Sequence, residues 1–368
     1  GFYKLAKSEE YPNLFLGQKL NADEVIWGLT YDSQINGVHA LSRYYYSDSM
    51  GDTPSATKEM VNMFLKTDGT PIDVKAGEGE KTLNDEFANR DKRLGWTVLG
   101  PGYKVLTSGE MKLMPMECNY SMTGYMLVKW LMPNRVNFLS GQDNNSILIY
   151  RYPEVLLNYA EAKAELGTLT QADLDNTVNL IRARAGVKGK LDMATANANP
   201  EPWIKGCYPY LAKLNPANLG VILEIRRERT VELVMEGFRY YDIMRWKEGS
   251  VFNEEFLGMY IAGPGPIDVS GDGKADFYIK TKGDTATPAA GLEVLNMEDG
   301  KVTLVTPNAS GANTYNGESG YLTTHTLDVL TRQWNEDRDY LYPIPTKERV
   351  LTNGVLTQNP GWEDGLGL

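Results

Sequence analysis

Oxygen-bearing side chains recur between residues 268 and 276, where the sequence has its most specific chemical pattern. Oxygen donors fall at loop positions 1, 3, 5 and 9, Gly273 stands at position 6, and position 7 offers a backbone carbonyl. This spacing suits a hard cation that takes about six to eight oxygen ligands. The sequence therefore predicts a structural Ca²⁺ site whose ligands come from Asp268, Ser270, Asp272, Lys274 and Asp276.

The same loop differs from an EF-hand at its end. Position 12 is Ile279, where an EF-hand carries glutamate, and residues 277–279 predict a strand that leaves the loop. Asp276 would then supply the carboxylate that a later glutamate supplies elsewhere. The alternative is an ordinary turn rich in aspartate and glycine, which needs no ion.

Three glutamates, Glu228, Glu232 and Glu236, recur at i, i+4 and i+8 and so share one face of a predicted helix. Paired carboxylates are the catalytic groups of glycoside hydrolases. Arginines are interleaved with these glutamates, and their charge lowers carboxylate pKa values, which works against the proton donor that glycoside hydrolysis needs. We therefore favour an ion-pair network that ties this helix to Asp242 and Arg245.

Most aromatic side chains in the chain carry a polar group, with 22 Tyr and 7 Trp against 9 Phe. Such a ring can stack on the apolar face of a sugar while its polar group faces water. Rings in periodic segments are expected in the core, whereas rings in loops are better placed to bind. The loop aromatics that we predict to bind ligand are Trp96, Tyr103, Trp203, Tyr208 and Tyr210.

Several familiar catalytic and binding sites are missing from the sequence. The two histidines, His39 and His325, stand in no zinc or di-iron motif, and Cys118 and Cys207 form no CxxC pair, so we expect both cysteines to pack in the interior. There is no P-loop, GxGxxG or GxSxG motif. The formal net charge of −11 repels phosphate backbones, so nucleic acid is not an expected partner.

Helical periodicity dominates the middle of the chain. One helix is predicted over 153–167 and a second over 170–186, and this pair spans the 34 residues of a tetratricopeptide repeat. Further helices are predicted over 222–236 and 238–247, and strands within 20–32, 277–279 and 301–305. No apolar stretch reaches the roughly 18 residues of a membrane-spanning helix. The sequence thus predicts a mainly α protein with loop-rich ends and short strands.

A set of short segments occurs in a fixed order over nearly the whole chain. The segments are DGTPI (68–72), NRDKRL (89–94), YRYPEVLLNYAEA (150–162), IRARAG (181–186), ERTVEL (228–233), EGFRYYDIMRW (236–246), YLYPIP (340–345) and QNPGW (358–362). Together they resemble the SusD/RagB family of surface nutrient-binding lipoproteins of Bacteroidetes. A similar calcium-type loop occurs in part of this family.

The resemblance implies a SusD-like scaffold of tetratricopeptide-type helical hairpins with a loop-rich ligand face. On this basis residues 1–150 form a loop-rich part that completes the ligand face, and residues 151–368 form the C-terminal helical scaffold with the loop 268–276. Trp246 and Trp362 would pack within the scaffold. The family's N-terminal part, with its signal peptide and lipid-bearing cysteine, has no counterpart in this chain, so membrane attachment is expected only through an anchor outside it.

The resemblance further implies binding rather than catalysis. Such a protein would capture an oligosaccharide at the cell surface and deliver it to a SusC-like, TonB-dependent transporter in the outer membrane. Three alternatives stay open: a member of the family that binds peptides, a glycan-degrading enzyme that uses paired carboxylates, and an assembly protein whose loops dock other proteins.

Overall fold

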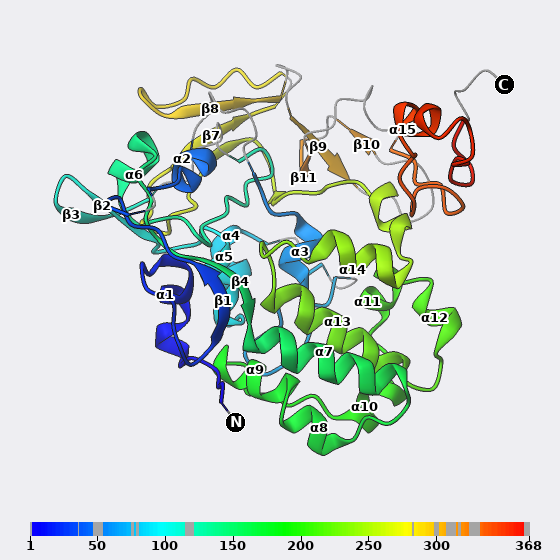
Figure 1. The fold of residues 1–368 in the computed structure, drawn as a ribbon. Coiled ribbons are helices and arrows are strands. Elements are labelled where there is room, and N and C mark those ends of the chain that lie inside the picture. Colours follow the sequence, from blue (N-terminus) through cyan, green and yellow to red (C-terminus); the bar gives the residue numbers. More distant parts are fainter. Residues whose placement is uncertain are drawn as a thin grey trace.

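Helices form the centre of the molecule and short strands surround them (Figure 1). The computed structural model describes residues 2–35, 37–46, 54–74, 77–78, 81–114, 121–281, 283–297, 302–306, 314–315, 318–323 and 332–363. The α-helices are α1 (Tyr11–Leu16), α2 (Leu41–Tyr45), α3 (Lys58–Met63), α4 (Leu83–Phe87), α5 (Lys92–Thr97), α6 (Arg135–Ser140), α7 (Tyr152–Glu165), α8 (Gln171–Asp175), α9 (Val178–Arg184), α10 (Met193–Ala198), α11 (Pro202–Cys207), α12 (Leu211–Leu214), α13 (Leu219–Glu232), α14 (Arg239–Trp246) and α15 (Thr346–Leu351). The predicted mainly α architecture is confirmed.

The predicted helical hairpin begins as expected and differs in its second half. Helix α7 carries Pro153 in its first turn, and Thr170 caps α8 in a reciprocal pair with Asp173. A single helix was expected over 170–186, but the helix is interrupted near Thr177, and a second helix, α9, follows. The Thr177 hydroxyl donates to the carbonyl of Asp173 at 2.6 Å, and such local side-chain bonds compete with the helical ladder.

Helix α13 lies at the centre of the helical region and packs on α7, α9 and α10 (Figure 1). It ends at Glu232, four residues before the predicted end, because Met235 adopts a left-handed conformation with φ of 61°. Gly237 follows with φ of 86°, a conformation that favours glycine, and the chain turns into α14. This turn sets the angle between the two helices.

The strands form small sheets. The strand expected within 20–32 is β1 (Val25–Leu29), which pairs antiparallel with β4 (Ile147–Arg151). The other sheets are the hairpin β2 (Lys104–Thr107) and β3 (Glu110–Leu113), the sheet β6 (Gly265–Ile267), β7 (Phe277–Lys280) and β8 (Glu293–Asn296), and the sheet β10 (Thr314–Tyr315), β9 (Thr303–Thr306), β11 (Gly320–Thr323) and β5 (Tyr260–Ile261). The strands predicted at 277–279 and 301–305 are therefore present as β7 and β9.

One hydrophobic core runs through the molecule. Its buried members include Leu14 and Val61 from the first part of the chain and Ile181 and Leu304 from the second. The division at residue 150 stays a prediction, because residues on both sides of it share this core. Within the described ranges, no helix is both long and apolar enough to cross a bilayer.

Candidate functional site

Two of the predicted binding residues, Trp96 and Tyr103, line one open pocket of about 540 Å³, here called the Trp96 pocket. Trp96 lies near the end of α5, whose first turn is capped by Asp91. Tyr103 follows the Gly100–Pro101–Gly102 turn that leads into β2. The sequence prediction thus named two rings that the fold brings together.

The ring of Trp96 is held from behind by Tyr11. The two rings stack with centroids 4.9 Å apart and planes 26° apart, so one face of the indole is covered by protein. Gly100 lets the turn approach closely, because a Cβ there would lie 2.3 Å from the ring of Phe87. The aromatic wall of the pocket is therefore positioned before any ligand arrives.

Polar groups complete the lining of the Trp96 pocket. The side-chain oxygen of Asn84 is buried and has no hydrogen-bond partner among the described residues. Lys92 lines the same pocket and is exposed. Burial raises the pKa of Tyr103 to about 12, so its hydroxyl keeps its proton and can donate a hydrogen bond. The pocket offers an acceptor, a cation and a hydroxyl donor beside an aromatic surface.

The loop predicted to bind calcium lies directly against the turn that precedes Tyr103. The backbone amide of Gly102 donates to the carbonyl of Ser270 at 3.0 Å. The Asn84 amide nitrogen donates to the carbonyl of Asp268 at 3.4 Å. The loop and the Trp96 pocket are separate in sequence and adjacent in the fold.

Backbone amides position the acidic side chains of this loop. Asp268 accepts from Gly271 at 2.7 Å and from Gly273 at 2.9 Å, and Asp276 accepts from Val269 and Ser270, both at 2.7 Å. Burial, and to a smaller extent the negative charge of Asp268, raises the pKa of Asp276. A cation would relieve that repulsion.

The donor set of the loop is nevertheless sparse in acidic side chains. Across the described residues, no three or more His, Cys, Asp or Glu side chains are grouped as a metal site. The exposed Asp272 bonds the amide of Lys274 at 2.9 Å. A bound Ca²⁺ would therefore depend on Asp268 and Asp276 together with hydroxyl, carbonyl and water oxygens, and calcium binding stays a prediction.

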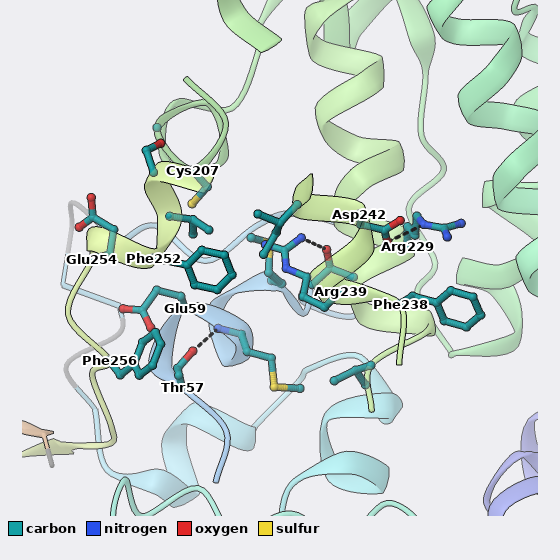
Figure 2. Close-up of a pocket in the computed structure, with 18 of the residues that line it drawn as sticks. Thr57, Glu59, Cys207, Arg229, Phe238, Arg239, Asp242, Phe252, Glu254 and Phe256 are labelled. Carbon is teal, nitrogen blue, oxygen red and sulfur yellow. Dashed lines mark hydrogen bonds and ion pairs between the residues drawn. The ribbon is translucent and has the colours of Figure 1, made fainter. Parts of the chain in front are cut away.

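Trp203 lines a different cavity, of about 560 Å³, here called the Trp203 cavity (Figure 2). Its walls come from α3, α11, the end of α13, α14 and the 3₁₀ helix η4 (Gly249–Asn253). The guanidinium carbon of Arg227 lies 6.0 Å from the centroid of the Trp203 ring. Cys207, which we expected to pack in the interior, also lines this cavity, and burial raises the pKa of its thiol to about 12. Cys118 and His325 lie outside the described residues.

The remaining two predicted rings lie elsewhere. Tyr208 is only 1% exposed, packs edge-on against Trp246 and accepts a hydrogen bond from Arg239. The prediction that its ring binds ligand is therefore wrong. The reason is that the chain passes under α14 at this point instead of looping outward. Tyr210 is half-buried, and the ammonium of Lys247 lies 5.3 Å from its ring centroid.

The three predicted glutamates, of which Glu228 and Glu232 lie on α13 and Glu236 lies beyond its end, are buried in an ion-pair network. Glu232 contacts Arg93 at 2.8 Å and also pairs with Arg151 and Arg184. Glu236 pairs with Arg151 at 2.6 Å. Burial would raise the pKa of both glutamates, but the adjacent cations hold both pKa values below the usual range.

The predicted continuation of this network to α14 is confirmed. Arg229 pairs with Asp242 at 2.7 Å, and Arg245 pairs with the same carboxylate at 2.9 Å. The three glutamates are thus occupied by arginines and do not provide the protonated carboxyl group that glycoside hydrolysis requires.

An exposed aromatic pair on the β1–β4 sheet was not predicted. Trp27 is 54% exposed and Tyr150 47%, and their ring centroids lie 5.7 Å apart. The two residues are opposite each other in the antiparallel pairing. This pair could be identified only from the strand pairing, because the local sequence of neither strand distinguishes its ring from the other aromatic residues.

Comparison with known proteins gives a consistent family. Residues 23–362 match the SusD family. A SusD-like protein from Bacteroides fragilis superposes with a TM-score of 0.58 at 20% identity, over 98% of this chain and 59% of that structure. A SusD-like carbohydrate-binding protein from the same species has a TM-score of 0.48 and 26% identity, over 66% of this chain and 45% of its own.

A surface glycan-binding protein from Bacteroides thetaiotaomicron gives a TM-score of 0.43 at 18% identity, over 98% of this chain and 56% of its own. The chain thus spans less than two thirds of these structures. No curated protein matches the sequence. The family match covers most of the chain and the fold agrees with it, so this chain belongs to the SusD family.

Proposed function

We propose that this protein binds an oligosaccharide in the Trp96 pocket and does not cleave it. The observation that carries the proposal is the convergence of Trp96 and Tyr103 on one open pocket. A sugar presents apolar C–H faces and many hydroxyl groups, and it needs both aromatic and hydrogen-bonding partners. The pocket combines these two kinds of group.

Each side chain of the pocket has a distinct part in this binding mode. The uncovered face of Trp96 stacks on a sugar ring, while Tyr11 keeps the indole in place. The unpaired oxygen of Asn84 accepts a hydrogen bond from a sugar hydroxyl, and Tyr103 and Lys92 donate to sugar oxygens. Satisfying the Asn84 oxygen removes the cost of a buried acceptor without a partner.

Membership of the SusD family extends the proposal beyond binding. The protein would act at the cell surface and deliver its glycan to a SusC-like, TonB-dependent transporter. The ion-paired state of Glu232 and Glu236 supports a non-catalytic role for these glutamates. Co-purification with a SusC-like transporter would test the partner.

Titration with plant, host and microbial oligosaccharides tests the binding proposal. We expect saturable heat release with intact sugar recovered by chromatography, and Trp96→Ala should weaken binding by roughly tenfold or more. Trp27→Ala is the matched control, because it removes an exposed indole from another part of the surface. Tyr103→Phe removes only the hydroxyl and should have a smaller effect than Trp96→Ala.

Other outcomes would contradict the proposal. Cleaved sugar would make the protein an enzyme. Loss of binding in Trp27→Ala, with Trp96→Ala unaffected, would move the site to the β1–β4 sheet. Binding of peptides instead of sugars would identify the peptide-binding alternative, and binding of neither would leave the assembly role.

A further inference from the structure

The Trp203 cavity has a lining unlike that of a sugar site. Most of its wall is apolar; the side chains that form it include Met60, Met63, Leu233, Phe238, Ile243 and Phe252. The cavity opens to solvent at the exposed residues Gly206, Pro209 and Phe256. A cavity of about 560 Å³ with such walls accommodates a small apolar molecule better than a hydrated sugar.

Two cations, Arg229 and Arg239, belong to this lining (Figure 2), and Arg229 is already paired with Asp242. The guanidinium of Arg239 donates to two neutral oxygens, the hydroxyl of Tyr208 at 3.0 Å and the hydroxyl of Thr230 at 3.1 Å. Within the part of the chain that the structure describes, no carboxylate lies within ion-pair distance of Arg239. Asp242, on the same helix, is already paired with Arg229 and Arg245.

Arg239 differs in this respect from the arginines of the neighbouring helices. Those of α9 and α13 all pair with carboxylates; they are Arg182, Arg184, Arg226, Arg227 and Arg229. A partly buried charge without a counter-ion is costly, and an arginine matches the planar geometry of a carboxylate. Asp242 stabilises the charge of Arg239 from beyond ion-pair distance, and an anion in the cavity would add a close counter-charge.

We propose that the Trp203 cavity binds a small apolar monocarboxylate, with its carboxylate group on Arg239 and its apolar part among the Met and Phe side chains. Four acidic side chains of the lining argue against a second negative charge on the ligand; they are Glu59, Asp242, Glu254 and Glu255. This site is distinct from the Trp96 pocket and does not depend on sugar binding there.

Calorimetric titration with phenylpropionate tests this proposal, with phenylpropionamide as the neutral probe of the same shape. We expect the carboxylate to bind roughly tenfold or more tightly than the amide, since a charge-assisted hydrogen bond is lost with the charge. Arg239→Gln should abolish that preference. Lys205→Gln is the matched control, because it removes an exposed cation of α11 that does not line the cavity.

A second variant tests the cavity independently, in case Arg239→Gln does not fold. Val251→Trp narrows the cavity without changing Arg239 and should weaken phenylpropionate binding, while thermal melting confirms that the variant folds. Equal binding of acid and amide would overturn the role of Arg239. Absence of binding to folded wild-type protein, or unchanged binding in Val251→Trp, would overturn the site itself.

Discussion

The backbone amide of Gly102 donates a 3.0 Å hydrogen bond to the carbonyl of Ser270, which links the turn before Tyr103 to the loop 268–276. The loop therefore supports one wall of the Trp96 pocket. A change inside the loop should alter the Trp96 pocket even though the loop itself need not touch a ligand there.

Asp276→Ala tests this link. Its carboxylate accepts from the amides of Val269 and Ser270, and leaving those amides unpaired should cost about 1–3 kcal/mol of folding free energy. We expect a lower Tm and weaker oligosaccharide binding. Asp272→Ala is the control, because Asp272 is exposed and bonds only the nearby amide of Lys274; equal effects of the two variants on binding would contradict the link.

Calcium should stabilise the same loop. Burial, and to a smaller extent the charge of Asp268, raises the pKa of Asp276, and a bound Ca²⁺ would offset both effects. Ca²⁺ should therefore raise the Tm, and chelation by EGTA should lower it. Asp268→Ala should abolish the response. Differential scanning calorimetry with Mg²⁺ as the control cation measures the effect, and an identical Tm with Ca²⁺ and EGTA would rule out the site.

Glu59 should make stability fall as pH rises. Burial raises the pKa of Glu59 from 4.5 to about 7, so the folded state disfavours the charged form. The resulting cost is absent below pH 4.5 and is complete above pH 7, where it reaches about 3 kcal/mol at most. Glu59→Gln should therefore raise the Tm at pH 8 and leave it unchanged at pH 4. The exposed Glu9→Gln serves as the control, because Glu9 does not line the cavity, and a pH-independent gain in Glu59→Gln would contradict the assignment.

Glu232→Gln should destabilise the protein strongly. The change leaves Arg93, Arg151 and Arg184 short of a buried counter-charge, and loss of one partner from a buried ion pair costs about 3–5 kcal/mol. Because the folded pKa of Glu232 is depressed, its stabilising effect is present above the pKa of the unfolded chain and is lost as the pH falls through the folded pKa. Denaturant unfolding at pH 7 and pH 3 measures both effects. The exposed Glu9→Gln should change neither.

Local signals in the sequence predicted the helices well. Pro153 and Thr170 mark helix starts by their own chemistry, so the hairpin could be read without tertiary information. The break at Thr177 could not, because the sequence does not show whether a side chain will bond the preceding turn or the solvent.

The candidate site was predictable only in part. Trp96 and Tyr103 lie on either side of a Gly-Pro-Gly turn, which signals a loop, but Trp96 is on α5 and both rings are half-buried against the core. Tyr208 stands in a similar context and is buried, because packing under α14 decides its exposure. The partners of Glu232 could not be predicted, because they too depend on tertiary packing. Arg93 is 139 positions away along the chain and contacts Glu232 only in the folded protein.

The ion pairs of α13 also restrict insertions and deletions within this helix during evolution. One residue inserted into α13 before Glu228 would turn every later side chain by about 100° and move it about 1.5 Å along the axis. Glu228 and Glu232 would then leave their arginines at the same time, and each lost pair would expose another unpaired charge in the interior. We therefore expect insertions and deletions among relatives to concentrate in the surface loops, and α13 to keep its length.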